Sequence, residues 1–326
     1  MPDRKKELLT ILADGKFHSG ESLAEALNVS RAAVWKHINS IRKLGLDVLS
    51  RRGRGYCLFQ PVELLDKSLI HAYLNNQVKK RLNALDVFFE IDSTNHYLLD
   101  RLKNGSVHAH AVVAEFQTEG KGRGDNRWLS PPASGICLSI GWSFDSTPAA
   151  LTALPLAAGV AVAEALADTG CSGIKLKWPN DIVAQDAKLG GILIESHAQI
   201  AGRCDVVIGV GINVCMPENI TTVIDQKVTD LSSVMQQRPS RNLLAALFLR
   251  RLVEALDTFT ERGFSAFIDK WRGLDYVRDK NAVLLLAKNR VPGKVVGIDE
   301  NGLLIMNVNG ENRSFSSGEL SLRVVN

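Results

Sequence analysis

Lys177, Asp181 and Lys188 are the residues whose types and spacing best suit chemistry. They lie in the runs Lys-Trp-Pro-Asn-Asp (177–181) and Lys-Leu-Gly-Gly-Ile-Leu-Ile-Glu (188–195), at the ends of two predicted strands. Two ammonium groups can stabilise the negative charge that builds up when an organic carboxylate meets a nucleotide phosphate. The spacing therefore indicates adenylation. The alternative for Asp181 is an ordinary turn carboxylate after Pro179.

A second group of cations lies in the glycine-rich segment 120–128. Its three glycines permit close backbone approach to a ligand, and Lys121, Arg123 and Arg127 supply positive charge for a phosphate. The segment has neither the Gly-Lys-Ser/Thr of a Walker A loop nor the setting of a dinucleotide fingerprint. Taken alone, it is equally compatible with a basic surface loop.

The composition favours a soluble protein of two or three domains. The chain has 326 residues, of which 45% are hydrophobic and 23% charged, enough to bury a large core. Its apolar runs are shorter than the ~20 residues that a membrane span requires, and its start does not resemble a signal peptide. We therefore expect a cytoplasmic protein without membrane contact. The five cysteines lack metal-ligand spacing and are expected to be small core residues, with a catalytic thiol as the alternative.

The positive charge is concentrated at the N-terminus. Residues 1–60 contain 11 of the 39 Lys and Arg and 6 of the 35 Asp and Glu, a net charge of +5, which leaves −1 for the remainder. Three helices are expected there, over residues 3–12, after Ser19 and after Ser30, followed by a hairpin at 47–58. The third helix has one apolar stripe, formed by Val34, Ile38, Ile41 and Leu44.

This pattern predicts a winged helix-turn-helix that binds DNA through its third helix and the tip of its hairpin. A winged helix that only binds protein or acts as a structural cover is the alternative. The candidate DNA-binding residues are Arg31, Ala32, Lys36 and His37 on the helix and Arg51, Arg52 and Arg54 in the wing.

The rest of the chain predicts an α+β fold. A helix over residues 61–81 is expected to bridge to a central domain, and residues 240–271 are expected to be rich in helix. The expected central elements are strands 87–91, 111–116, 136–142, 174–178, 191–195 and 206–211 and a helix at 152–169. Short strands are expected at 282–287, 294–298 and 303–308, so that the predicted domains are 1–62, 63–273 and 274–326.

The ordered set of motifs resembles the bifunctional biotin protein ligases that repress the biotin operon, the BirA family. Besides the runs already described, the matching segments are Asp92-Ser93-Thr94-Asn95, Ala114-Glu115-Phe116-Gln117, Gly209-Val210-Gly211-Ile212-Asn213, and residues 30–38 and 53–56. The resemblance covers essentially the whole chain. It implies a winged helix-turn-helix, a mixed-sheet ligase domain similar to class II synthetases and a small SH3-like C-terminal barrel.

The resemblance also implies the reaction and the partners. Biotin would react with ATP, in the presence of Mg²⁺, to give biotinyl-5′-AMP. Its biotinyl group would then pass to a lysine of the biotin carboxyl carrier protein of acetyl-CoA carboxylase. The adenylate would promote homodimerisation, and the dimer would bind operator DNA.

The family roles carry over position by position. Lys188 would hold the biotin carboxylate and then the adenylate phosphate, Arg123 would neutralise phosphate, and Asp181 would position Mg²⁺ or orient Lys177. The biotin-binding candidates are Ser93, Thr94, Asn95, Gln117, Gly120, Lys121, Gly122, Arg123, Trp128, Lys188, Gly190 and Gly191. The nucleotide-binding candidates are Arg123, Lys188, Asn213, Glu319 and Arg323.

Several of these positions have a structural alternative. Trp128 could be a core residue, the glycines around Asn213 could form a strand bulge, and Glu319 with Arg323 could form a solvated salt bridge. The sequence departs from the family loop at Asp125 and Asn126. Residues 215–246 contain no aromatic side chain, so adenine would be held by aliphatic groups.

Two other functions remain open at this point. One is a transcription regulator whose ligase site only senses biotin. The other is a lipoate ligase, which shares the sheet and a catalytic lysine.

Overall fold

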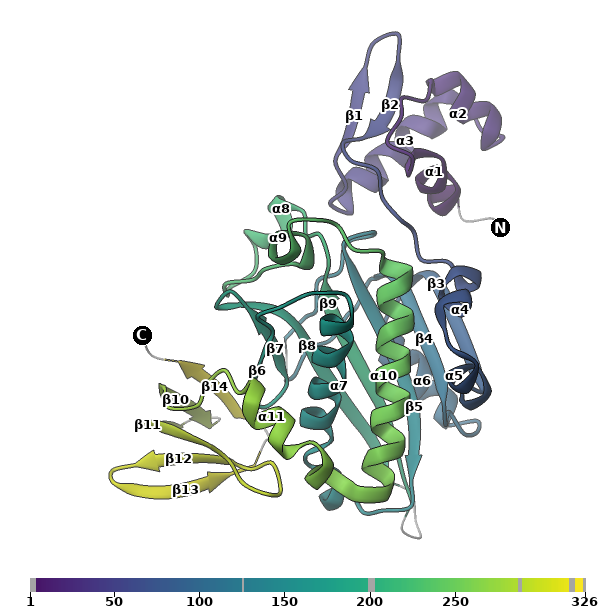
Figure 1. The fold of residues 1–326 in the computed structure, drawn as a ribbon. Coiled ribbons are helices and arrows are strands. Elements are labelled where there is room, and N and C mark those ends of the chain that lie inside the picture. Colours follow the sequence, from purple (N-terminus) through teal and green to yellow (C-terminus); the bar gives the residue numbers. More distant parts are fainter. Residues whose placement is uncertain (1–3, 125, 199–202, 287–288, 317–319, 325–326) are drawn as a thin grey trace.

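The computed structural model describes residues 4–124, 126–198, 203–286, 289–316 and 320–324. Three parts follow one another along the chain (Figure 1). An N-terminal bundle with a hairpin lies beyond one end of a large twisted sheet, which helices cover. A smaller C-terminal sheet lies at the other end.

The N-terminal part is the predicted winged helix. It comprises α1 (Arg4–Leu12), α2 (Gly20–Ala26), α3 (Arg31–Lys43), β1 (Val48–Arg51) and β2 (Gly55–Leu58). The Oγ atoms of Ser19 and Ser30 accept hydrogen bonds from the first turns of α2 and α3, which fixes where these helices begin.

The apolar stripe of α3 is buried at Val34, Ile38 and Ile41, as predicted. Leu44 is only half-buried, because it caps the end of the helix and Gly45 follows with a φ of +95°.

The predicted helix over residues 61–81 is wrong in extent. Residues 59–66 form an irregular linker, and two short helices follow, α4 (Lys67–Tyr73) and α5 (Asn76–Arg81). The side chains of Asp66 and Asn75 cap the two helices, and Leu74 between them is extended. The periodicity of the apolar residues alone predicted one helix. Asn75 caps a second helix within the same apolar run, so the run forms two helices.

The central sheet has seven strands in the order β3-β4-β5-β9-β8-β7-β6. Only β3 and β4 run parallel, so the sheet is mixed as predicted. All six expected strands are present, and β7 is an additional one. Their bounds are β3 (Ala84–Ile91), β4 (His110–Gln117), β5 (Gly135–Phe144), β6 (Lys175–Lys177), β7 (Asp181–Ala184), β8 (Ala187–Ala198) and β9 (Cys204–Asn213).

One face of this sheet is covered by α7 (Leu154–Asp168) and α10 (Arg241–Arg262), which lie in front of it in Figure 1. The opposite face carries α6 (Thr94–Leu102). Residues 148–168 are long and apolar enough for a membrane span, with a mean hydropathy of 1.8 in their 18-residue window, so the prediction that the apolar runs are too short is wrong for this segment. Because 72% of its 18-residue apolar window is buried, it has the character of a core helix. The remaining helices are α8 (Glu218–Thr221), α9 (Leu231–Met235) and α11 (Ile268–Leu274).

The C-terminal part is a five-stranded antiparallel sheet in the order β13-β12-β11-β10-β14. The three predicted strands are confirmed, and two further strands complete the sheet. The bounds are β10 (Asn281–Leu286), β11 (Asn289–Ile298), β12 (Leu304–Val308), β13 (Glu311–Phe315) and β14 (Leu320–Val324). Trp178 Nε1 donates to Gly302 O at 3.1 Å, which joins this sheet to the central domain beside the Lys-Trp-Pro-Asn-Asp run.

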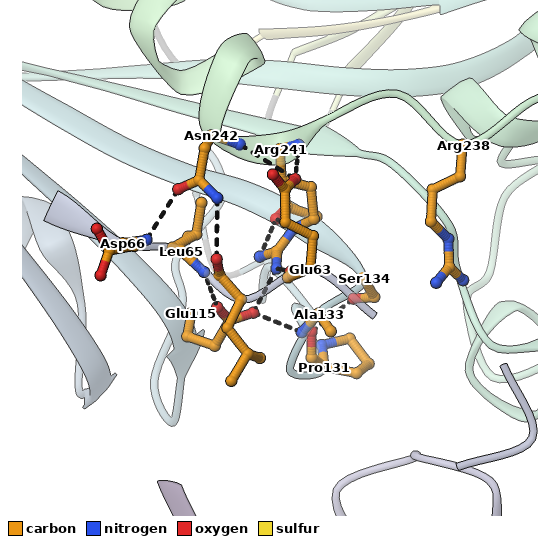
Figure 2. Close-up of polar contacts among 12 residues, drawn as sticks. Glu63, Leu65, Asp66, Glu115, Pro131, Ala133, Ser134, Arg238, Arg241 and Asn242 are labelled. Atoms are coloured by element: carbon orange, nitrogen blue, oxygen red, sulfur yellow. Dashed lines mark hydrogen bonds and ion pairs between the residues drawn. The ribbon is translucent and has the colours of Figure 1, made fainter. Parts of the chain in front are cut away.

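A buried ion pair fixes the linker to the central domain (Figure 2). Arg241, at the start of α10, lies 2.6 Å from the carboxylate of Glu115 on β4, and both side chains are almost fully buried. The guanidinium also donates to the carbonyls of Glu63 and Gly135, and Leu65 N donates to Glu115. Since each charged group is also hydrogen-bonded, the burial of this pair is compensated.

The winged helix also touches the central domain directly. Lys5 Nζ of α1 lies 3.1 Å from Glu90 Oε2 of β3. A Cβ atom added to Gly45 would lie 3.3 Å from Ile220 of α8 and 3.6 Å from Pro131. Pro131 follows the glycine-rich segment, so the winged helix contacts the chain just beyond that segment.

Candidate functional site

Three consecutive strands bring Lys177, Asp181 and Lys188 together. Asp181 pairs with Lys177 across the β6–β7 turn and with Gly191 across the β7–β8 hairpin. Lys188 Nζ lies 2.7 Å from Asp181 Oδ1, with both side chains about four-fifths buried. The three residues therefore lie close together, as their spacing in the sequence predicts.

Glycine is required at one position beside this pair, Gly190, and a second glycine, Gly191, lies directly against it. A Cβ atom added to Gly190 would lie 2.5 Å from Gly211 O, and one added to Gly191 would lie 3.7 Å from both Lys188 Nζ and Asp181 Oδ1. The first would clash with the neighbouring strand, and any larger side chain at the second would crowd the ion pair. Because these two glycines have no side chains, they leave space beside Lys188.

Two arginines share this neighbourhood. Burial lowers the pKa of Lys177, and repulsion from Lys188 and Arg323 lowers it further, whereas Asp181 opposes the shift. Burial likewise lowers the pKa of Arg123, again opposed by Asp181. Arg123 from the glycine-rich segment and Arg323 from β14 therefore act on the same small region as the two lysines. Lys177, Lys188 and Arg123 near one carboxylate, with Arg323 close enough to act on Lys177, make a cationic region suited to an anion.

Lys177→Met should raise the free energy of unfolding by about 1 kcal/mol, measured by urea denaturation at pH 7. The pKa of Lys177 is lower in the folded state than in the unfolded chain. Holding the proton at neutral pH therefore costs folding free energy. This cost declines once the pH rises past the folded pKa and vanishes above the unfolded pKa. Methionine removes the charge and keeps the packing volume. A stability equal to or below that of the parent protein would contradict this account.

A buried polar cluster lies on the adjacent strands. Ser93 caps α6, Thr94 N donates to Gln117 Oε1 at 2.8 Å, and the Thr94 hydroxyl lies 3.0 Å from the same oxygen. Ser139 Oγ on β5 lies 2.6 Å from Thr94 Oγ1 and 2.6 Å from Asn95 Oδ1. All of these residues are buried. Ser139, which the sequence did not predict, therefore joins Thr94, Asn95 and Gln117 into one hydrogen-bonded cluster, and Ser93 lies beside it as the cap of α6.

The glycine-rich segment is folded back on itself. Trp128 N donates to Gly120 O, Gly122 N donates to Asn126 O, and Asn126 Nδ2 donates to Arg123 O, each at 2.8 Å. A Cβ atom added to Gly120 would lie 2.4 Å from Trp128 O, so this close approach requires glycine. Asn126, one of the two departures from the family loop, thus holds the turn together; Asp125 lies outside the described residues.

Trp128 lies half-buried against β9. A Cβ atom added to Gly211 would lie 2.5 Å from the indole ring, so the ring rests directly on the backbone of that strand. The ring is only half-buried, whereas Trp142, Trp178 and Trp271 are almost fully buried core residues. Lys121 is exposed, and Arg127 pairs with it across the turn.

Asn213 ends β9 near Lys188. Its Nδ2 donates to Thr229 O at 3.0 Å, and Thr229 N donates to Lys188 O at 2.9 Å. Lys188 N in turn donates to Lys227 O at 2.9 Å. The segment 227–229 therefore connects Asn213 with the lysine. Arg323 is exposed, and Glu319 lies outside the described residues.

The winged helix presents a basic surface. Arg31, Ala32 and Lys36 of α3 are exposed, and His37 is half-buried. The wing arginines Arg51, Arg52 and Arg54 are also exposed, and the guanidinium groups of Arg51 and Arg54 lie 5.6 and 4.4 Å from the centre of the Phe17 ring. Trp35 is 55% exposed between Ala32 and Lys36. Trp35 is therefore a further candidate for DNA contact on the exposed face of α3, and the charge pattern did not reveal it.

The cysteines are confirmed as largely structural. Cys57, Cys137, Cys171 and Cys204 are buried, and burial raises the pKa of the last three thiols. Within the described ranges, no group of three His, Cys, Asp or Glu could hold a metal ion. A hollow of about 490 Å³ lies between α5 and α10. Its lining residues are not among the candidate site residues described in this section.

Comparison with known proteins matches two parts of the chain to family models. Residues 87–213 match the biotin/lipoate A/B protein ligase family, and residues 4–57 match a helix-turn-helix domain. The bifunctional ligase/repressor BirA of Salmonella typhimurium is 39% identical over 319 residues, covering 97% of this chain and 96% of that protein. The protein of the same name from Escherichia coli is 37% identical with the same coverage. The Aquifex aeolicus biotin protein ligase in complex with biotin and ATP is 30% identical, with a TM-score of 0.63 over 75% of this chain and 100% of that one.

Fold and site together define a winged helix joined to a ligase domain of the biotin/lipoate class. The chain belongs to the BirA family of bifunctional ligase/repressors.

Proposed function

We propose that this protein is an ATP-dependent biotin protein ligase that also represses transcription by binding DNA. The observation that carries the proposal is the Lys188–Asp181 ion pair with Lys177 and Arg123 in its electrostatic neighbourhood, beside a buried polar cluster. The family supports it, since a relative aligned over nearly the whole chain is named a ligase/repressor. A structural relative also binds biotin and ATP.

Two displacements at a single site make up the reaction. A carboxylate oxygen of biotin attacks the α-phosphorus of ATP, and pyrophosphate leaves. The resulting mixed anhydride, biotinyl-5′-AMP, is attacked by a lysine amine of the carrier protein. An amide forms, a proton is lost from the nitrogen and AMP leaves.

Lys188 is the central catalytic residue of the first step. Its ammonium group, held by Asp181 at 2.7 Å, binds the biotin carboxylate and then the α-phosphate. Arg123 neutralises the phosphate from the glycine-rich segment, and Lys177, opposite Asp181 on β6, adds a further positive charge. Because these cations are held in place before the substrate binds, little reorganisation is needed in the transition state.

The Mg²⁺ that accompanies ATP would be held mainly by phosphate oxygens and water. Asp181 is the one protein carboxylate that we assign to it, and a single carboxylate is compatible with magnesium, which retains several waters. When bound, the ion supplies positive charge to the phosphates. Asp181 also orients Lys188, because its Oδ1 lies 2.7 Å from Lys188 Nζ.

The polar cluster binds the ureido ring. A ring with two N–H donors and one carbonyl needs matched partners in a dry site, and Ser93, Thr94, Asn95 and Gln117 supply donors and acceptors. Trp128 packs on the valeryl chain. Gly120, Lys121 and Gly122 add backbone groups, Gly190 and Gly191 admit the ligand beside Lys188, and Asn213, Glu319 and Arg323 contact the nucleotide.

The partners follow from the same two activities. The acceptor is the biotin carboxyl carrier protein of acetyl-CoA carboxylase, and the second macromolecular partner is operator DNA. We also propose a cytoplasmic location and a homodimer that forms with bound adenylate, since a two-fold dimer suits a palindromic operator.

Arg54→Ala should weaken binding to operator DNA and reduce the slope of log K against log salt by about 1, with adenylation unchanged. The residue is an exposed cation at the wing, and loss of one phosphate contact releases one fewer counterion. Filter binding over a range of salt concentrations measures the slope. Arg272→Ala, an exposed arginine on α11, is the matched control. An unchanged slope would support a purely structural winged helix.

Biotin-dependent exchange of labelled pyrophosphate into ATP tests the ligase proposal. Exchange requires a reversible attack of the acid on the α-phosphate, which a protein that only senses biotin would not catalyse. The family model also covers lipoate ligases, so the same assay is run with lipoate. Exchange with lipoate but not biotin, or with neither acid, would contradict the proposal.

A further inference from the structure

Trp35 is a large apolar side chain left in solvent on α3, the helix that we assign to DNA binding. It is 55% exposed, whereas Trp142, Trp178 and Trp271 are almost fully buried. In the part of the chain that the structure describes, the Trp35 ring makes no ring–ring or cation–π contact. Single exposed apolar residues are common on protein surfaces, so exposure alone indicates no function. The position of Trp35 on α3 is what distinguishes it.

Trp35 is the fifth residue of α3, near the end of the helix that reaches base edges in helix-turn-helix proteins. Arg31 and Asn39 lie one turn before and one turn after it on the same side of the helix, and Ala32 adjoins it. Arg31 and Ala32 are exposed, and Asn39 is half-buried. The ring therefore lies among the side chains that would enter a groove of the duplex.

The charge of α3 limits what can cover this ring. The helix carries four cations, Arg31, Lys36, Arg42 and Lys43, and has no Asp or Glu. A second copy of α3 would be repelled by these charges, whereas a DNA duplex brings phosphates to both sides of its major groove. The occupant that fits is therefore a duplex, and the ring meets a group inside the groove.

Thymine supplies the apolar group on the base edges of the major groove, its C5-methyl. The other groups exposed there are hydrogen-bond donors and acceptors, for which an indole offers one N–H donor and no acceptor. The carbon face of the ring is therefore best covered by the methyl group. Ala32, three positions before Trp35, has the smallest side chain after glycine and leaves room for a base beside the ring.

We infer that Trp35 is a specificity-determining residue, which selects thymine in the operator by packing on its C5-methyl group. The inference rests on the proposed function, because it names a base that the DNA-binding surface reads. Cations on α3 and the wing contact phosphates, which are the same in every sequence. Trp35 adds a preference among sequences without adding a phosphate contact.

The test replaces single thymines by deoxyuridine, which lacks only the methyl group. The probes are duplexes selected from a random pool by the parent protein in the presence of biotin, ATP and Mg²⁺. For at least one thymine, the replacement should weaken binding by the parent protein about fourfold, the effect of exposing one buried methyl group. In Trp35→Ala the same replacement should change the affinity little, because the ring that covered the methyl group is gone.

Trp35→Ala should also bind the unmodified duplex about tenfold more weakly than the parent protein, as expected for removal of a buried aromatic anchor. The slope of log K against log salt should stay unchanged, since no phosphate contact is lost. This distinguishes Trp35 from Arg54. Tyr73→Ala is the matched control, because Tyr73 is an aromatic residue of similar exposure, 52%, on α4. It should keep the parent affinity and the parent response to deoxyuridine.

Equal responses of the parent protein and Trp35→Ala to every deoxyuridine replacement would overturn the inference, since the ring would then contact sugar or phosphate. Parent affinity of Trp35→Ala for the unmodified duplex would overturn it as well. If Trp35→Ala fails to fold, Trp35→Gln, which keeps a good helix former at this position, decides by the same comparison. Selection of no duplex by the parent protein would instead contradict the DNA-binding part of the proposed function, and the inference with it.

Discussion

Lys188→Ala is expected to lower the rate of biotinyl-5′-AMP formation by about 10²–10³-fold, the usual effect of removing one group that stabilises developing charge. Lys188 Nζ is fixed 2.7 Å from Asp181 and lies beside Gly191, where the backbone leaves room for a ligand. Arg123 and Lys177 remain in the variant, so some phosphate binding should persist. The rate constant should therefore fall more than the affinity for ATP.

Lys227→Ala is the matched control for this variant. Lys227 is hydrogen-bonded to Lys188 through the backbone, but its exposed side chain is directed toward Gln185. Its replacement should leave adenylation within about twofold of the parent rate, as for most surface changes. Single-turnover measurement with labelled ATP distinguishes the two variants. A folded Lys188→Ala protein with nearly the parent rate would remove the role that we assign to this lysine.

Arg241→Ala is expected to lower the free energy of unfolding by about 3–5 kcal/mol, because it leaves the buried carboxylate of Glu115 without its counterion. The change also removes the donors to the carbonyls of Glu63 and Gly135. Glu115 lies two residues before Gln117 on β4, and Gly135 begins β5 just after the glycine-rich segment. The linker and the polar cluster should therefore be disturbed together.

Arg250→Ala, on the same helix, is the control for Arg241→Ala. Arg250 pairs with Asp168, but Arg251 pairs with the same carboxylate, so no buried charge is left alone. Its replacement should cost about 0–1 kcal/mol. Urea denaturation of both variants at pH 7 gives the difference. Equal changes in the free energy of unfolding would show that the Arg241–Glu115 pair contributes no more to stability than the Arg250–Asp168 pair.

Much of the fold could be predicted from local patterns. Ser30 followed by Val34, Ile38 and Ile41 gives the start and the buried face of α3, and both follow from capping and helical period alone. The central strands were predictable because they are apolar runs bounded by turn residues. The single helix predicted over 61–81 is wrong because apolar spacing does not reveal that Asp66 and Asn75 each begin a new helix.

The candidate site was predictable where a motif keeps its residues close in sequence. Lys188 and Asp181 are seven positions apart, and one hairpin brings them together. Ser139 could not be found in this way, since it lies 45 residues from Thr94 and a lone serine in an apolar strand has no distinguishing pattern. Arg241 is 126 residues from Glu115, and only the packing of α10 on the sheet makes them partners. Long-range pairing is set by the tertiary fold, which the local sequence does not encode.

Mass spectrometry of the protein after incubation with biotin, ATP and Mg²⁺ tests the central claim most directly. Biotin and AMP joined as one acyl adenylate should be recovered bound to the parent protein, and this species should be nearly absent from Lys188→Ala. Addition of the carrier protein should discharge the adenylate and leave one biotinyl group on the carrier. Recovery of biotin and ATP without any joined species, from a folded protein saturated with both, would contradict the account.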